Sequence, residues 1–338
     1  MPRPVTELAQ RTEAVFPGVD RGRGHYESFY LRASHPAEAL GVWIRHTIHK
    51  PPGADPVGSV WFTLFDADGP KASKVTVGAE ALSVPDGGYV RVGESTITPG
   101  TAIGSAPSDQ LSPAWDLSFE AGAPMFRHLP REWMYRAPVP RTKTLSPHPS
   151  TTFSGHVELD GRRIELDGWR GMVGHNWGAE HAERWIWTNG MGFDGFADAY
   201  LDAAIGRIKV GRFTTPWIGN GVLFLEGEEH RLGGLERTRA TVVRDTPQGA
   251  QLVLPGKGVK VKGRVGAEHP LFVGWEYADP DPASERHNTV NCSIASMTLT
   301  VEREGKAPVE LHTAHGATYE LGMRETDHGV PLQPFGDG

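Results

Sequence analysis

The segment Gly171–His181 and the residues just after it hold the densest group of chemically reactive side chains in the chain. Imidazole and carboxyl groups can transfer protons, and the face of an indole attracts an apolar or a cationic molecule. This combination predicts a pocket in which such a molecule lies next to a proton donor. The indoles could instead fill the end of a barrel, with His175 and Asn176 satisfying buried backbone groups. The residues concerned are His175, Asn176, Trp177, Glu180, His181, Trp185 and Trp187.

Gly174 and Gly178 bracket the polar part of this segment. Glycine allows the backbone to bend sharply or to approach a neighbour closely. Trp185 and Trp187 follow with the alternation that places side chains on one face of a strand. We therefore expect a strand, a turn bracketed by the glycines, and a second strand that carries the tryptophans.

A second group of polar side chains lies in Phe196–Asp202. Strand alternation places Asp198, Tyr200 and Asp202 on one face, where two carboxylates would flank a phenol and could form an acid site. The same pattern is typical of an ordinary amphipathic strand with a solvated polar face, so both interpretations stay open. The triplet Trp275–Tyr277 offers a further carboxylate among aromatic side chains.

The other reactive residue types give no comparable pattern. There are 15 histidines, but none has the close helical spacing of a zincin, and a single cysteine excludes a cysteine-rich metal site. We therefore expect no metal and no cofactor. A Gly-x-Ser-x-Gly nucleophile elbow is absent from the sequence. Cys292 lies in the alternating run 291–300, which favours a packed and inert thiol.

The length and the composition of the chain limit the classes of protein to which it could belong. The chain of 338 residues exceeds the size at which one core usually keeps growing, which favours two domains. With 34 basic and 41 acidic residues and no Lys/Arg run, nucleic acid and anionic membrane are disfavoured as main partners. No stretch has the length of a signal peptide core or of a membrane span, and the single cysteine is compatible with a reducing cytoplasm. We expect a cytoplasmic protein without an integral membrane segment.

Short alternating runs bounded by turn residues recur along the whole chain and predict an all-β protein. Asp-Gly dipeptides at 68–69, 86–87, 160–161 and 194–195 predict tight hairpins, because their turns require positive φ. A short helix is expected over Thr6–Phe16. The proline-rich stretch 137–149 is expected to be a long crossing loop, since proline is poorly tolerated in central strands. The run 153–166 reads as the closing hairpin of a first barrel, which gives two domains, 1–183 and 184–338.

The run Gly171–Gly178, which ends in His-Asn-Trp-Gly, and the Trp-x-Trp strand at 185–187 resemble a tandem lipocalin-like superfamily. This superfamily contains carotenoid 1,2-hydratase (hydroxyneurosporene synthase), tocopherol cyclase and AttH-like proteins. Weaker similarity lies in Glu27–Tyr30, in 43–48 and in 316–320. The resemblance implies two consecutive lipocalin-like or calycin-like antiparallel β-barrels. It also implies a cofactor-independent hydratase or cyclase that acts on a hydrophobic isoprenoid or polyene substrate.

Hydration or cyclisation of an alkene requires a proton donor, an apolar enclosure for the cation and controlled access for water. By its position in the motif, His175 is the first candidate for the acid or orienting residue, and Asn176 for holding a water or a substrate oxygen. Glu180, His181 and Asp198 are further candidates for proton transfer. The candidates for contact with the ligand are Trp43, Trp177, Trp185, Trp187, Tyr200 and Trp275.

Two other functions fit the same residues. Lipocalin-type barrels hold small apolar ligands, so the protein could be a non-catalytic carrier. It could also be a pericyclase, in which the pocket acts by folding the substrate. The sequence leaves open the identity of the ligand, the oligomeric state, and whether the pocket lies within one barrel or between the two.

Overall fold

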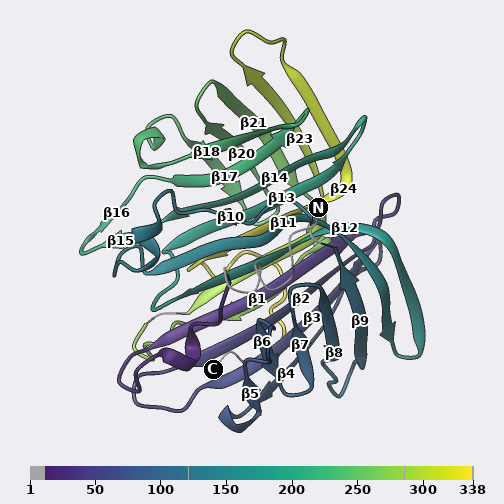
Figure 1. Ribbon diagram of the computed structural model, residues 1–338, viewed down its shortest axis with the longest axis vertical. Helices are drawn as coiled ribbons and strands as arrows, with labels where there is room; N and C mark the ends of the chain where they lie inside the picture. The colour runs from purple at the N-terminus through teal and green to yellow at the C-terminus, as the bar shows by residue number, and fades with distance from the viewer. Residues whose placement is uncertain (1–11, 121, 285, 337–338) are drawn as a thin grey trace.

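The computed structural model describes residues 12–120, 122–284 and 286–336. Within them, the first twelve strands form an antiparallel sheet that curls into a nearly closed barrel (Figure 1). Its strand order is β4-β3-β2-β1-β12-β11-β9-β8-β7-β6-β5, and β10 pairs with β11. The strands are β1 (His25–Ser34), β2 (Gly41–Lys50), β3 (Val57–Asp66), β4 (Gly69–Val77), β5 (Leu82–Ser83), β6 (Val90–Val92), β7 (Ser95–Ile97), β8 (Thr101–Ser105), β9 (Pro113–Phe119), β10 (Phe126–Arg127), β11 (Thr142–Leu159) and β12 (Arg162–Gly178).

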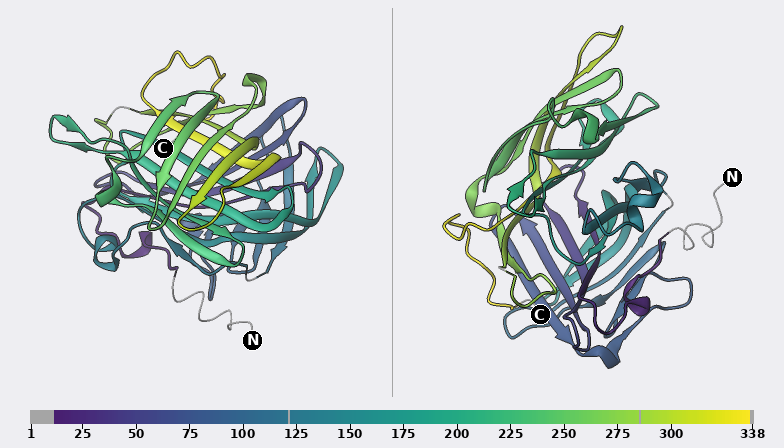
Figure 2. Two further views of the ribbon diagram at one scale, coloured as in Figure 1. Left: turned by 90° about the horizontal axis from the view of Figure 1, so that it is seen from above. Right: turned by 90° about the vertical axis from the view of Figure 1, so that its left-hand side faces the viewer.

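Ten later strands form a second antiparallel sheet, an open half-barrel that curves over one side of the first (Figure 2). Its order is β18-β17-β14-β13-β24-β23-β21-β20-β19, and β22 pairs with β23. Its strands are β13 (Arg184–Phe193), β14 (Phe196–Arg207), β17 (Ile218–Leu225), β18 (Glu228–Gly233), β19 (Val242–Thr246), β20 (Gly249–Pro255), β21 (Val259–Gly266), β22 (Val273–Tyr277), β23 (His287–Arg303) and β24 (Val309–Met323). A separate hairpin consists of β15 (Lys209–Val210) and β16 (Phe213–Thr214).

The helices of the described residues are short 3-10 turns, and none is long and apolar enough to cross a membrane. They are η1 (Phe16–Gly18), η2 (Ala79–Ala81), η3 (Glu132–Tyr135), η4 (Leu235–Arg237) and η5 (His269–Leu271). Residues 6–11 of the helix expected over Thr6–Phe16 lie outside the described residues, and the prediction was wrong for the described part, since residues 12–15 are not helical and only the 3-10 turn η1 begins at Phe16. The all-β prediction with two consecutive antiparallel barrels is confirmed, with the second barrel open.

The chain leaves the first sheet at Gly178 and enters the second at Arg184. We keep 1–183 and 184–338 as the proposed division into domains. The hairpins predicted at the four Asp-Gly dipeptides are confirmed, because each dipeptide lies at the turn that joins two paired strands. The connection at 86–87 is a six-residue loop, 84–89, and not a tight turn. The glycine of each dipeptide has positive φ, as at Gly161 (81°) and Gly195 (74°).

The prediction of a loop over the whole of residues 137–149 was wrong, because its second part belongs to β11. Two prolines of this strand, Pro147 and Pro149, lie where the pairing with β12 shifts register, between Leu145 and Thr151. On the other side of β11, the pairing with β10 ends at Ser146, and the pairing with β9 begins at Phe153. A proline that donates no hydrogen bond is tolerated there, since the ladder is already interrupted on both sides.

The turn expected around residues 174–178 was also wrong, since β12 runs straight through to Gly178. Gly174 instead permits the Tyr30 ring to lie close to the backbone of β12. It lies opposite Tyr30 of β1, and a Cβ atom built on it would be 2.2 Å from the Tyr30 ring. The same arrangement recurs in the second sheet, where Gly322 lies opposite and beneath the Trp185 indole. These glycines let a large aromatic ring lie flat on the neighbouring strand.

Replacement of Gly174 by alanine is expected to destabilise the protein by about 2 kcal/mol, because an added methyl group must displace the Tyr30 ring. Urea unfolding monitored by tryptophan fluorescence measures this difference. The matched control is Gly22→Ala, where a Cβ atom would meet nothing within 4 Å. Equal stability of the two variants would contradict the assigned role of Gly174.

The molecule has two hydrophobic cores, because the wall shared by β1, β2 and β12 is buried on both of its faces. Phe29, with its neighbours on the same face, lies in the core inside the first barrel. Tyr30 and Trp43 lie on the opposite face of the wall, in a core that includes the apolar residues of the second sheet. Alternation along each strand of this wall therefore decides whether a side chain faces the interior of the first barrel or the second sheet.

One buried arginine joins the two sheets. Arg32 of β1 donates hydrogen bonds to the side chain of Asn189 (3.1 Å) and to the carbonyl of Gly316 (3.0 and 3.1 Å), both in the second sheet. Burial lowers the pKa of Arg32 to about 9. Hydrogen bonds that a charged group donates to neutral acceptors are stronger than ordinary ones, so this residue helps to fix how the sheets pack.

Candidate functional site

A cavity of about 590 Å³ lies between the outer wall of the first barrel and the second sheet. Tyr26, Tyr30 and Trp43 line it from the first barrel, and Trp185, Trp187 and Tyr277 from the second. Residues from the segment 128–140, which precedes β11, line a further part. A cavity of this size, walled mainly by aromatic and aliphatic side chains, is typical of a site for a small apolar molecule.

The best-positioned group for proton transfer in this wall is His181. Its Nδ1 lies 2.7 Å from Oδ1 of Asp279, and the same oxygen accepts the His181 backbone N–H at 2.6 Å. The ring is stacked on Tyr26, with centroids 4.0 Å apart. These contacts fix both the position and the tautomer of the imidazole. Nε2 has no hydrogen-bond partner among the described residues and is itself buried. His181 lines the cavity, so a bound molecule would reach this nitrogen after a small shift of the ring or of its neighbours.

The surroundings of Asp279 keep it charged. Burial by itself would raise the pKa of this carboxyl group, but the hydrogen bond and the charge of His181 outweigh burial and lower it. His287 lies next to the pair, with its ring centroid 5.8 Å from that of His181, and burial lowers the pKa of His287 to about 3. The dyad therefore consists of an ionised aspartate and the imidazole that is hydrogen-bonded to it, with a neutral histidine behind them.

Among the described residues, His181, Asp279 and His287 have ligand atoms within 4.8 Å of one another, close enough for a metal site to be considered. The distance of 2.7 Å between His181 Nδ1 and Asp279 Oδ1 decides against it. Two ligands of one tetrahedral zinc ion lie roughly 3.3 Å apart, given bond lengths near 2.0 Å. The observed geometry is that of a hydrogen bond.

Each tryptophan of the Trp-x-Trp strand donates its indole N–H to a buried carboxylate. Trp185 Nε1 lies 3.0 Å from Glu320 Oε1, and Trp187 Nε1 lies 3.3 Å from Asp202 Oδ1. Glu320 also accepts a hydrogen bond from Asn291 (3.2 Å), and it lines the cavity. The indoles thus have two functions here, since their faces form apolar wall and their N–H groups orient carboxylates.

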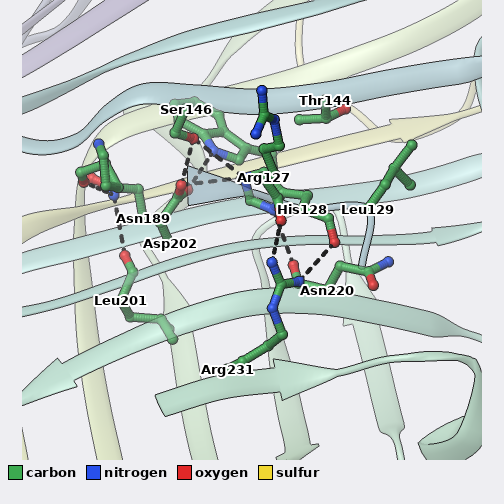
Figure 3. A network of polar contacts seen from close by, with 12 residues as sticks. Arg127, His128, Leu129, Thr144, Ser146, Asn189, Leu201, Asp202, Asn220 and Arg231 are labelled. Carbon is green, nitrogen blue, oxygen red and sulfur yellow. Dashed lines mark hydrogen bonds and ion pairs between the residues drawn. The ribbon is translucent and has the colours of Figure 1, made fainter. Parts of the chain in front are cut away.

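The Asp202 carboxylate belongs to a network that reaches the cavity through His128 (Figure 3). Ser146 donates to Asp202 at 2.6 Å, and His128 Nε2 lies 3.3 Å from the same oxygen. His128 Nδ1 lies 3.1 Å from the carbonyl oxygen of Asn220. Each ring nitrogen of His128 therefore lies next to an oxygen atom of this network.

Comparison with known proteins rests mainly on structure. No family model matches the chain. Uncharacterized proteins from two strains of Mycobacterium tuberculosis are 25% identical to it over 322 residues, which covers 93% of this chain and 91% of theirs. The crystal structure of an AttH protein from Nitrosomonas europaea has a TM-score of 0.51 at 12% identity, over 92% of this chain and 97% of that one. Kievitone hydratase from Nectria haematococca gives the same two values, over 94% and 92%.

This chain has their tandem lipocalin-like fold. At this level of identity the likeness concerns the fold alone. Within the lipocalin-like fold, the described cavity lies between the two barrels, which answers the question that the sequence left open.

The predicted site residues divide into two groups. Five of them line the cavity, namely Trp43, Asn176, His181, Trp185 and Trp187. The other six lie outside its lining, namely His175, Trp177, Glu180, Asp198, Tyr200 and Trp275. Alternation along β12 separates neighbours in the motif, because Asn176 faces the second sheet while His175 faces the interior of the first barrel.

His175 is buried in the first barrel rather than at the cavity. It is stacked on Phe29 with centroids 3.9 Å apart and on Trp177 with centroids 4.4 Å apart. Its Nε2 lies 2.8 Å from Oε1 of Glu27, whose carboxylate also accepts the backbone N–H groups of Val15 and Phe16. This network holds the start of the described chain against β1, so we assign a structural role to His175.

The remaining predicted residues have other environments. Glu180 forms an ion pair with Arg141. Asp198 is exposed near the start of β14. Tyr200 is stacked on Phe224 with centroids 5.6 Å apart, and it is buried in the second sheet. Trp275 is fully buried, with its ring centroid 5.0 Å from that of Trp61.

Sequence reasoning did not select three polar residues that complete the site, namely His128, Asp279 and Glu320, and it named a fourth, Asp202, only as part of a larger group. His128 and Asp279 follow no motif, and no signal in the sequence could have found them. Asp202 was part of the constellation on β14, and its burial distinguishes it from Asp198. Glu320 ends the run 316–320 that carries a weak family resemblance, so a signal for it was present.

Proposed function

We propose that this protein is a cytoplasmic enzyme that hydrates or cyclises a hydrophobic isoprenoid or polyene molecule by proton transfer to a carbon–carbon double bond, without a redox cofactor. The observation that carries this proposal is the His181–Asp279 dyad, whose imidazole lines an apolar cavity and keeps Nε2 unpaired among the described residues. A carrier has no need of an oriented proton donor. An acid–base enzyme requires one.

The enclosure suits a cationic intermediate. Trp43, Trp185 and Trp187 line the cavity, and the negative potential over an aromatic face attracts positive charge that develops on carbon. Glu320 and Asp202 hold negative charge on either side of the Trp-x-Trp strand, since β13 pairs with β24 and with β14. Both features stabilise a cation more than they stabilise the neutral alkene, which is the requirement for catalysis.

The steps balance as follows. Protonated His181 donates its Nε2 proton to one alkene carbon, and the neighbouring carbon becomes a cation. Asp279 stabilises the imidazolium beforehand and keeps its orientation. In hydration, water adds to the cation and gives a proton to Glu320, which lines the cavity. In cyclisation, a second double bond of the same molecule adds to the cation instead, and the new cation loses a proton to Glu320, which restores a neutral product.

Incubation in deuterium oxide tests this proposal. Farnesol, geranylgeraniol and squalene are offered as probes, and mass spectrometry of the extracted products detects deuterium bound to carbon. We expect one deuterium on carbon for each turnover, since the acid exchanges its proton with solvent. Tight binding of a probe without any conversion would indicate a carrier, and a cyclised product without deuterium would indicate a pericyclase. Either result would overturn the proposal.

A further inference from the structure

We infer that the mouth of the cavity docks on an anionic membrane surface, so that an apolar ligand passes between bilayer and cavity without crossing water. The inference goes beyond the proposed function and does not require it, because a membrane-docked carrier would show the same surface. It rests on where the exposed apolar side chains lie and on the charges around them.

The five most exposed large apolar side chains of the described residues all lie on three segments that contribute to the cavity lining, 127–141, 207–217 and 235–240. Trp133 (64% exposed), Val139 (56%) and Leu235 (61%) line the cavity and face solvent at once, so they form its rim. Other exposed large apolar residues, such as Ile103, reach at most 47%. A patch of this kind at the entrance of a cavity marks an interaction surface.

The hairpin β15–β16 extends this rim. Ile208, just before it, lines the cavity, and Ile208 and Thr215 close the hairpin through two hydrogen bonds of 3.0 and 3.1 Å. Val210 (56% exposed) and Phe213 (66%) lie beyond this point, outside the lining of the cavity. The hairpin and η3 lie on the same side of the molecule, at the left of Figure 1 and facing the viewer in the right panel of Figure 2.

The overall charge disfavoured an anionic membrane as a main partner, but the rim has a net positive charge where the whole chain has a net negative one. The segments 127–141, 207–217 and 235–240 hold nine basic and two acidic residues, although the chain has a net charge of -7. Arg141 and Arg237 are paired with Glu180 and Glu236, and the three segments still keep a clear positive charge. The basic residues are Arg127, Arg131, Arg136, Arg141, Arg207, Lys209, Arg212, Arg237 and Arg239.

Exposed aromatic and aliphatic tips among basic side chains are the pattern of elements that insert into a lipid headgroup region. The apolar tips enter the acyl boundary, and each arginine or lysine is attracted to anionic lipid. A protein partner would need a single surface that is both acidic and apolar. An anionic bilayer leaflet has negatively charged headgroups and apolar acyl chains, and it also dissolves an apolar ligand. The continuity of the rim with the cavity therefore favours the bilayer as the occupant.

Co-sedimentation with vesicles tests the inference on the full chain. The probes are phosphatidylcholine vesicles with and without 30% phosphatidylserine, in about 0.1 M salt, where charges separated by more than roughly 10 Å are screened. We expect binding to the anionic vesicles, weakened at least tenfold by the double change Val210→Ser and Phe213→Ser. The matched control is Ile103→Ser, an exposed apolar residue on β8 of the first barrel. A second pair, Arg212→Glu against Lys257→Glu, tests the charge at the rim against an exposed lysine elsewhere.

Three results would overturn the inference. The first is equal binding to both kinds of vesicle, or to neither, and the second is equal loss of binding in the rim and control variants. The third is a dimer that the Phe213→Ser change dissociates in analytical ultracentrifugation, since the patch would then join two copies of the chain. Vesicle binding that persists without any turnover of the isoprenoid probes would contradict the enzyme proposal alone.

Discussion

Replacement of His181 by alanine is expected to lower kcat about 10²–10⁴-fold, the range that removal of a general acid typically costs. The affinity for the apolar ligand should change little, because the aromatic wall remains. Steady-state kinetics on whichever probe is turned over separates the two effects. His312→Ala is the matched control, since His312 is an exposed histidine on β24.

The change Asp279→Asn tests whether the dyad acts as a unit. An amide in place of the carboxylate still occupies the space but no longer stabilises the imidazolium, so we expect roughly a 10²-fold loss of kcat. Full activity in both His181→Ala and Asp279→Asn would refute the assignment of the dyad.

Replacement of Glu27 by glutamine is expected to destabilise the fold by about 3 kcal/mol near neutral pH. Glu27 is buried and accepts hydrogen bonds from His175, from Val15 and from Phe16. Burial alone would raise its pKa, but hydrogen bonds from His175 and His25 outweigh burial and lower it from the ordinary 4.5 to about 2. A shift of this size corresponds to about 3 kcal/mol, at 1.36 kcal/mol per unit.

The direction of the pH dependence follows from this shift. A carboxyl group with a lowered pKa in the folded state stabilises the fold fully above its ordinary pKa of 4.5 and loses that contribution as the pH falls toward 2. His175 acts in the same direction, since burial lowers its pKa and its protonation below pH 6.5 opposes folding. We therefore expect stability to begin to fall below about pH 6.5 through His175 and to fall further between about pH 4.5 and pH 2 through Glu27.

Urea unfolding of the wild type and of the Glu27→Gln variant, from pH 7 down to pH 3, measures this dependence. The variant should be less stable than the wild type at pH 7, and its free energy of unfolding should decrease less as the pH falls. The exposed Glu304→Gln is the matched control and should stay within about 0.5 kcal/mol of the wild type. Parallel curves for wild type and Glu27→Gln would contradict the role of Glu27.

Several features of this protein could be predicted from the sequence because they depend on local chemistry. Alternating apolar residues and Asp-Gly dipeptides act within a few residues, and they gave the all-β class and the hairpins correctly. Trp185 and Trp187 share a face for the same reason, and both line the cavity. The proline-rich segment was misjudged, since the register shifts that accommodate its prolines in β11 depend on the partner strand.

The assignment of the acid depended on information that the motif lacks. His175 and His181 both lie within the conspicuous segment, and nothing in their spacing distinguishes a core residue from a cavity residue. The distinction arises because β12 ends at Gly178, so that His175 alternates into the first barrel while His181 lies in the connection between the sheets. The partners that define their roles, Glu27 and Asp279, are 148 and 98 residues away.

By itself, therefore, the sequence determined the strands, the hairpins and the segment in which the candidate chemistry lies, because each depends on the order of neighbouring residues. The tertiary structure alone decided which histidine reaches the cavity, which carboxylates complete the site, and where the scattered basic and apolar residues of the rim come together. These outcomes depend on strand register and on the packing of one sheet against another. Contacts of that kind join residues 15 to 148 positions apart, and no local pattern encodes them.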